Sequence, residues 1–199
     1  MARPFRQHAD EVILDRAAAL FARQGFAKTS VQDVADAVGL SKAGLLHHYP
    51  SKDALHRSVL EQAQALGGRA LDSVGQLPEG PARDRRALEL LVDVALAHPG
   101  LVSLLLAPLT EGTQDCGIPE VDSAGAAALR AFGVDPDAPP SERSIRVLGA
   151  LAALAVLTLA AHQHDDTTGW RRSIVATCFD ALGHRRPGAA LPDLDQVEA

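Results

Sequence analysis

The chain has few aromatic residues and few cysteines, and both shortages restrict what it can be. Only 4% of its 199 residues are aromatic, so a core must come from alanine, leucine and valine, which favour helices over sheets. The two cysteines, Cys116 and Cys178, lie far apart and have no redox or metal-binding spacing, which indicates inert thiols in a reducing compartment. We therefore predict an all-α protein of a reducing cytoplasm.

Long uncharged apolar segments are also scarce. The N-terminus has no apolar stretch of the kind found in a secretory signal. The longest uncharged apolar run, residues 147–161, has 15 residues, whereas a helix needs about 20 to cross a bilayer. We expect this run to form a buried helix and expect no contact with a membrane.

Charge is divided unevenly along the chain. The net charge is −6, which by itself argues against a nucleic-acid partner. Residues 1–60, however, hold eight Lys and Arg against six Asp and Glu, an excess of +2, and the remainder carries −8. Such an asymmetry is typical of a basic binding segment attached to an acidic body.

The first sixty residues contain the start and stop signals of four helices. We expect one from about residue 8 to residue 24, ended by Gly25. A second begins after Thr29 or Ser30 and ends at Gly39, and Ser41 begins a third only two residues later. Two helices joined by so short a turn must cross at a steep angle, which is the helix-turn-helix arrangement.

The remaining helices are expected further along the chain. Ser51 begins a fourth helix that continues to about residue 74, with Gly67 and Gly68 as a point of bending. Further helices are predicted near residues 82–97, 101–106, 119–131, 141–162 and 168–183. Residues 110–119 are predicted to form a loop, and 185–199 a flexible tail.

No sequence signature of an enzyme is present. The chain lacks the G-x-S-x-G, P-loop, HExxH and dinucleotide fingerprints. The segment from His162 to Asp166 contains imidazoles and carboxylates that could bind a metal, but solvated histidines are common at such a helix end. We predict neither catalytic residues, nor a metal site, nor a cofactor.

Residues 22–55, ARQGFAKTSVQDVADAVGLSKAGLLHHYPSKDAL, resemble the N-terminal segment of the tetracycline-repressor (TetR) family of bacterial regulators. The family carries a tyrosine where this chain has Leu46. The positions in register are Gly25, Phe26, Thr29, Ser30, Val34, Ala35, Val38, Gly39, Leu40, Ser41, Leu45, His48, Tyr49, Ser51 and Lys52. Residues 56–199 resemble the family only in helix count and length. The resemblance implies DNA binding by the third helix, a body that binds an effector, and dimerisation through the last two helices.

Small and polar residues begin the third helix, as entry into the DNA major groove requires. The family's tyrosine commonly contacts the DNA backbone. Here Leu46 is a candidate for a thymine methyl contact instead, and His47 for a phosphate or a base edge. Free N–H groups at helix starts favour phosphate near Thr29 and Lys52. The predicted DNA-binding residues are Thr29, Ser41, Lys42, Ala43, Gly44, Leu46, His47, His48 and Lys52.

The body is assigned two further surfaces. The helix near residues 141–162 is apolar on nearly every side, which predicts a dimer interface at Val147, Leu148, Leu151, Leu154, Leu157 and Leu159, with burial inside one chain as the alternative. The middle helices are expected to enclose a pocket for a small apolar or amphipathic effector. Its predicted lining is Leu88, Leu91, Val92, Leu101, Leu104, Leu105 and Trp170.

These features together predict a transcriptional regulator. We expect residues 1–55 to bind DNA, residues 56–184 to bind the effector and dimerise, and the protein to repress from a palindromic operator as a ligand-responsive homodimer. The alternative is a regulator that activates, or that acts through a protein partner without a small-molecule effector. Neither the effector, the operator nor the regulated genes follow from the sequence.

Overall fold

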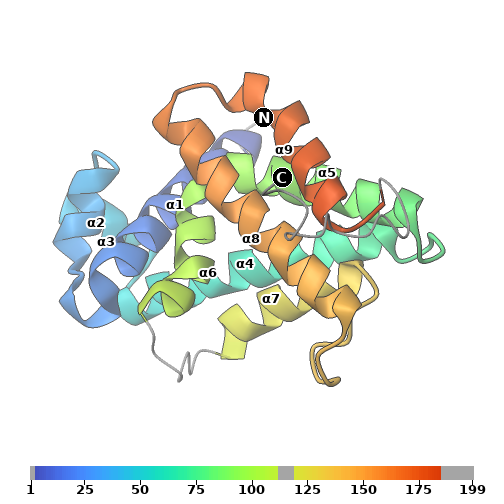
Figure 1. The fold of residues 1–199 in the computed structure, drawn as a ribbon. Helices are drawn as coiled ribbons and strands as arrows, with labels where there is room; N and C mark the ends of the chain where they lie inside the picture. The colour runs from blue at the N-terminus through green and yellow to red at the C-terminus, as the bar shows by residue number, and fades with distance from the viewer. Residues whose placement is uncertain (1–2, 112–118, 185–199) are drawn as a thin grey trace, which may run out of the picture.

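The computed structural model describes residues 3–111 and 119–184, and side chains within 9–107 and 124–184. Regular structure in these ranges is entirely helical and has two parts (Figure 1). The first four helices are α1 (Arg3–Lys28), α2 (Val31–Ala37), α3 (Lys42–His48) and α4 (Lys52–Val74). The others are α5 (Pro81–Ala97), α6 (Pro99–Glu111), α7 (Pro119–Ala131), α8 (Glu142–Gln163) and α9 (Thr167–Ala181). The all-α prediction is confirmed.

The head, which we define as α1 to α3 with the start of α4, is organised by serine caps. The Ser30, Ser41 and Ser51 side chains each accept a hydrogen bond from the backbone N–H three residues later, at 3.1, 3.0 and 3.0 Å. Gly39 has φ 70°, a left-handed conformation that suits the turn between α2 and α3. The predicted starts of the second, third and fourth helices are therefore confirmed, with Ser30 rather than Thr29 as the cap of α2.

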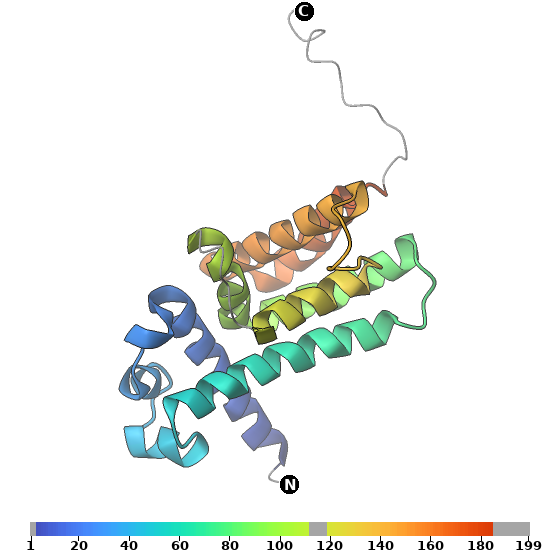
Figure 2. The ribbon, with the colours of Figure 1, turned by 90° about the horizontal axis from the view of Figure 1, so that it is seen from below.

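Helix α4 connects the head to the remaining helices, which we call the body, and is seen along its length in Figure 2. Helix α4 is continuous through Gly67 and Gly68, where the sequence suggested a bend. A Cβ on Gly67 would lie 3.3 Å from both the Ala124 carbonyl oxygen and the Ala127 Cβ. This glycine therefore lets α7 pack closely against α4.

A buried carboxylate ties several body helices together. Asp84, in the first turn of α5, is 1% exposed. Its two oxygens lie 2.7 and 2.6 Å from Nη2 of Arg143 in α8, and His184 Nε2 lies 2.6 Å from one of them. Arg143 also donates to the Phe132 carbonyl at 3.0 Å. These contacts join α5, α8 and the segments that follow α7 and α9.

The head and the body meet where α1 crosses the start of α6. A Cβ on Gly100 would overlap the Asp15 carbonyl oxygen, so the two backbones touch at this point. The Asp15 carboxylate accepts a hydrogen bond from the Leu101 N–H at 3.1 Å. Burial raises the pKa of Asp15, although this hydrogen bond and His98 partly oppose the shift. Leu101 and Leu104 of α6 belong to the same buried cluster as the core of the head.

Two predicted helix ends differ from the structure. Helix α1 continues past Gly25, its predicted end, to Lys28, although Gly25 itself has the non-helical angles φ 79° and ψ 155°. Helix α6 continues through Pro108 to Glu111, whereas the sequence predicted an end before that proline. Helices α5 and α6 meet at His98 and are bent by 102° with respect to each other. The predicted tail, 185–199, and most of the predicted loop, together with Cys116, lie outside the described residues.

Candidate nucleic-acid interface

Helix α3 lies at one end of the molecule beside α2, with the body on the other side of α1 (Figure 1). The turn between the two helices is closed by hydrogen bonds from the Gly39 and Leu40 N–H groups to the carbonyls of Asp36 and Ala35. Leu45 is fully buried and anchors the inner side of α3 in the core. The geometry therefore presents the start and the outer side of α3 to solvent.

Most of the predicted contact residues on α3 are accessible. Ser41, Lys42, Ala43, His47 and His48 are exposed, and Gly44 and Leu46 are half-buried. The Ser41 hydroxyl caps the helix by accepting from the Gly44 N–H. The start of α3 thus combines the Lys42 cation, which has no ion-pair partner among the described side chains, with small side chains and a fixed helix end, which suits an approach to DNA base edges and phosphates.

Thr29 is misassigned as a DNA contact. Its side chain is 1% exposed, and its hydroxyl donates to the Gly25 carbonyl at 2.8 Å. Its backbone N–H bonds to the same carbonyl at 3.3 Å. Because both of its donors are used inside the head, Thr29 closes the end of α1.

Lys52 is also engaged within the chain. Its ammonium donates to the carbonyls of Phe26 at 2.9 Å and Ala27 at 3.4 Å, and it lies 4.2 Å from the centre of the Phe26 ring. A cation at the carbonyl end of a helix is favoured by the helix dipole. The structure therefore shows Lys52 joining α4 to the end of α1, and the phosphate contact stays a prediction.

His48 and Tyr49 lie toward α1. His48 Nδ1 is 3.4 Å from Asp10 Oδ1, and the histidine side chain is 39% exposed. Tyr49 ends α3 and is half-buried, and burial, with a smaller effect of Asp10, raises its pKa to about 12. Tyr49 is thus a packing residue, while His48 keeps an accessible edge.

The predicted dimer residues divide between the two sides of α8. Val147 and Leu154 are buried within the chain, so their assignment to an interface is wrong. Leu148 is 54% exposed, and the half-buried members are Leu151, Leu157 and Leu159. The sequence missed Ile145 and Val156, which are 63% and 59% exposed. Their spacing from Leu148 places all three on one outer side of the helix.

Helix α8 is longer than the apolar run of 15 residues on which the membrane prediction was based. With 22 residues it is long and apolar enough to cross a bilayer by length and composition. Only 28% of its most apolar stretch is buried within the chain, so one chain alone does not supply the predicted burial. A core helix of a soluble protein passes the same test, and an apolar outer face of this kind requires a cover.

Most of the predicted effector lining is core. Leu88 and Val92 are 0% exposed, and Leu101 and Leu104 are 4% and 7% exposed. The first pair packs with the body core and the second pair with the head core, so these four residues do not line one cavity. Leu91 and Leu105 are half-buried against the same two cores.

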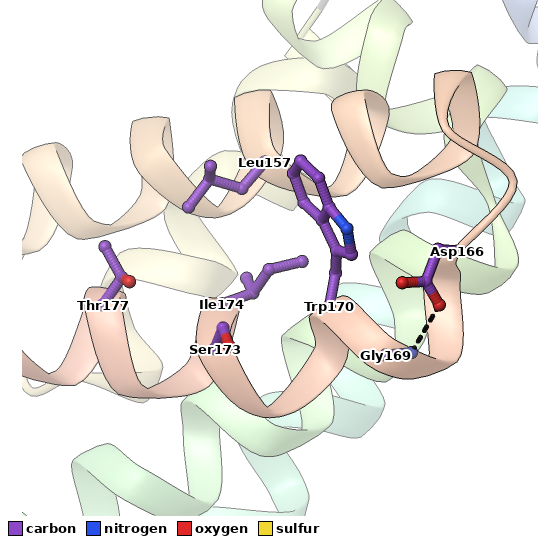
Figure 3. Close-up of a pocket in the computed structure, with 7 residues that line it drawn as sticks. All are labelled: Leu157, Asp166, Gly169, Trp170, Ser173, Ile174 and Thr177. Carbon is purple, nitrogen blue, oxygen red and sulfur yellow. Dashed lines mark hydrogen bonds between the residues drawn. The ribbon is translucent and has the colours of Figure 1, made fainter.

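Trp170 does line a cavity, on the surface between α8 and α9 (Figure 3). This groove has a volume of about 360 Å³, and Figure 3 shows the indole beside Leu157 of α8. Asp166 is directed to the start of α9, where it accepts from the Gly169 N–H at 2.9 Å. A second groove, of about 590 Å³, separates α1 from α6 and was not predicted.

The metal alternative at residues 162–166 gains no support from the described side chains, where three or more ligating groups do not gather. His162 Nε2 lies 2.8 Å from the Leu96 carbonyl. His164 stacks on Trp170 with ring centres 5.4 Å apart, and Asp166 caps α9. Packing and capping thus account for these residues.

Known proteins resemble the chain most strongly in the head. Residues 13–59 match the family described as bacterial regulatory proteins, tetR family. The repressor KstR2 of Rhodococcus jostii is 44% identical over 48 residues, 24% of each chain. The regulator AcrR of Shigella flexneri is 32% identical over 98 residues, 47% of this chain and 45% of AcrR. The regulator YuxN of Bacillus subtilis is 29% identical over 112 residues, 54% of this chain and 38% of YuxN.

The matches thus span less than half the length of each of these relatives. All three are named as regulators of transcription, in agreement with the prediction that the chain is not an enzyme.

Similarity to solved structures extends over the whole fold. The TetR-family regulator PfmR from Thermus thermophilus superimposes with a TM-score of 0.58 at 20% identity, covering 88% of this chain and 99% of PfmR. A TetR-family regulator from Bordetella parapertussis gives a TM-score of 0.55 at 21% identity, covering 86% and 94%. The head thus matches the tetR family by sequence over residues 13–59, and the described helices share the fold of solved TetR-family regulators.

Proposed function

We propose that this protein is a ligand-responsive transcriptional repressor of the bacterial cytoplasm that binds a palindromic operator as a homodimer. The observation that carries the proposal is the exposed polar start of α3, held after a tight turn at one end of the molecule. In this proposal residues 1–55 bind DNA and residues 56–184 bind the effector and dimerise. Leu101 and Leu104 extend the head core into the body, which would link the two activities.

The DNA contacts are assigned to the accessible residues of α3. Lys42, at the first position of the helix, is placed to meet a phosphate, and Ala43 and Gly44 permit close approach of the helix to the base edges. Leu46 and His47 follow one turn later, and His48 contributes its exposed edge. With a head charge of only +2, affinity would depend on these few contacts and on pairing of two heads.

Dimerisation is supported by the outer face of α8. Ile145, Leu148 and Val156 form an exposed apolar row on a helix whose most apolar stretch is mostly uncovered within the chain. A second copy related by a two-fold axis would cover this row with the same row, which is the usual symmetry of protein dimers. The same axis would position the two α3 helices to contact two symmetry-related half-sites, which lie one helical turn of DNA or a multiple apart.

The proposed response to a ligand is supported by fewer observations than DNA binding or dimerisation. Among the described side chains, Gln62 Oε1 in α4 is buried and lacks a hydrogen-bond partner, and such an atom is a ready contact for a ligand donor. Two surface grooves offer further room. A repressor that releases its operator on ligand binding requires coupling of this kind between two sites.

DNA binding is tested by fluorescence anisotropy with duplexes from the region upstream of the protein's own gene, over a series of salt concentrations. Lys42→Ala should weaken binding about tenfold and lower the salt dependence by about one counterion. Arg86→Ala, which removes an equal charge from an exposed site on α5, is the matched control and should leave affinity unchanged. The proposal fails if the wild-type protein shows no salt-sensitive affinity for duplex DNA.

Self-association is tested by light scattering after size-exclusion chromatography. The wild-type chain of 20.9 kDa should elute with twice that mass, and Leu148→Glu should elute as a monomer. Val12→Glu changes a residue of α1 that is 46% exposed, compared with 54% for Leu148, and should leave the dimer intact. A dimer that survives Leu148→Glu would exclude this face as the interface.

A further inference from the structure

We propose that the groove between α1 and α6 binds an amphipathic carboxylate, and that this ligand changes how the head is held against the body. The groove, which we call the head–body groove, has a volume of about 590 Å³, within the range of small-molecule sites. The binding claim stands on the groove alone. The effect on the head rests on the proposed function.

The walls of the head–body groove are aliphatic. Leu20 of α1, Leu106 of α6 and Leu159 of α8 line it together with small residues. Ser103 also lines it, but its hydroxyl already donates to the Pro99 carbonyl at 2.9 Å. The groove therefore offers little that would hold a sugar or another densely polar ligand, and it favours an alkyl or aryl body.

Two cations border this apolar surface. Arg16 and Arg23 line the groove and are both exposed, and the described residues provide neither of them with an ion pair. They lie seven residues apart on α1, which separates them by two helical turns, about 10 Å along the axis, on the same side. The groove lining contains no acidic residue, so its charge is positive only.

Charge complementarity selects the class of ligand. A guanidinium presents two parallel N–H donors that match the two oxygens of a carboxylate, whereas a cationic amphiphile would be repelled by both arginines. A ligand with one carboxylate and an aliphatic body would pair with an arginine and cover the leucine side chains. The inferred occupant is therefore an amphipathic carboxylate.

The groove adjoins the contact between head and body. Most of its lining residues belong to α1 and α6. These two helices are joined by the Asp15–Leu101 hydrogen bond and by the backbone contact at Gly100. Because Gly100 leaves no free space there, a ligand that separates the far parts of α1 and α6 must tilt one helix on the other. The end of α1 is tied through Lys52 to the start of α4, so a tilt of α1 would reposition the helices that hold α3.

Binding is tested by titration calorimetry of the full chain with octanoate, kept below the concentration at which micelles form. Octylamine and octanol are the control ligands. They have the same alkyl chain length, but octylamine carries a positive charge and octanol carries none. We expect octanoate to bind at least tenfold more tightly than either, and the double variant Arg16→Gln/Arg23→Gln to lose at least tenfold in octanoate affinity. Arg86→Gln is the matched control and should bind octanoate like the wild type.

Two further measurements keep the test decisive. Ala19→Phe fills the groove without changing charge and should also abolish binding, and circular dichroism verifies that each variant folds. Absence of octanoate binding to the wild type, equal binding of octylamine, or full affinity in the arginine double variant would each overturn the site.

The coupling is tested separately from the binding. Octanoate should change the affinity of the wild-type protein for operator DNA at least fivefold and should have no effect on the double variant. If octanoate binds in the groove but DNA affinity is unchanged, the coupling is wrong and the site stands. If the protein binds no DNA even without octanoate, the proposed function fails while the carboxylate site remains tested by calorimetry.

Discussion

The polar contacts within the head and those within the body join residues at different separations in the sequence. In the head, three serine side chains each accept from a backbone N–H three residues away. In the body, the Asp84 carboxylate meets Arg143 and His184, which are 59 and 100 residues distant. Arg171 pairs with Asp93 across 78 residues. Local serine caps thus set the helix starts of the head, whereas the polar contacts that span the most sequence lie in the body.

The two regions nevertheless share a core. Leu101 and Leu104 of α6 belong to the same buried cluster as Leu45 of α3. Helix α4 contributes to both clusters, with Leu55 in one and Val74 in the other. The head and the body can therefore unfold together even though their polar contacts span different lengths of sequence. Substitutions in each region distinguish joint unfolding from independent unfolding.

The largest effects are expected from truncating one fully buried leucine in each region. Leu45 in the head and Leu88 in the body are both 0% exposed. Leu45→Ala and Leu88→Ala should each lower the free energy of unfolding by about 2–5 kcal/mol, since each removes apolar contacts and leaves a cavity. Urea unfolding followed by circular dichroism should show one transition in both variants, because the head core includes α6.

The control is Leu148→Ala, which truncates a leucine that is 54% exposed on α8 and should change monomer stability much less. It is measured at concentrations low enough to dissociate a dimer. A separate early transition in Leu45→Ala alone would show that the head unfolds independently and would contradict the shared core.

Breaking the buried ion pair of the body should have an effect of comparable size, and it should be asymmetric. Arg143→Met leaves the Asp84 carboxylate, 1% exposed, with only His184, and should cost up to about 3–5 kcal/mol. Asp84→Asn leaves Arg143, whose side chain is 35% exposed and can reach water, and should cost less. Equal losses in the two variants, measured by urea unfolding at pH 7, would contradict the asymmetry.

The same difference in range explains what the sequence could predict. Ser41 and Gly39 signal a helix start and end within a few residues, so the four helices of the head follow from the sequence. Thr29 was misassigned, and the inward contacts of Lys52 were missed, because their partners, the carbonyls at the end of α1, depend on the packing of three helices. The sequence of α8 is apolar on both its inner and its outer side, so it did not show that Val147 is buried within the chain whereas Leu148 is exposed.

A smaller effect is expected from removing the serine caps. Ser41→Ala and Ser51→Ala should each lower the free energy of unfolding by about 1 kcal/mol, because one N–H at a helix start loses its acceptor. Ser173→Ala on the exposed side of α9 caps nothing and serves as the control. Thermal unfolding measures all three. A cap variant as stable as the control would mean that water replaces the hydroxyl without cost.

The smallest effect is a dependence of stability on alkaline pH that comes from the body core. Cys178 is fully buried, and burial raises the pKa of its thiol from 9.0 to about 11. Between these two values the unfolded chain loses the thiol proton and the folded chain keeps it. The unfolded state then binds fewer protons, so the free energy of unfolding should fall as pH rises from 9 to 11.

This slope is measured as a difference, because Tyr49, with a pKa of about 12, also titrates in alkaline solution. Cys116→Ser leaves Cys178 as the one thiol of the chain, and Cys116→Ser/Cys178→Ala removes it. Stability of the single variant should fall more steeply above pH 9 than that of the double variant.

At pH 8 a thiol reagent should modify Cys178 only as fast as the body opens, and Leu45→Ala should speed this modification if head and body unfold together. A thiol that reacts rapidly in the folded protein would contradict its burial and remove the reason for the slope.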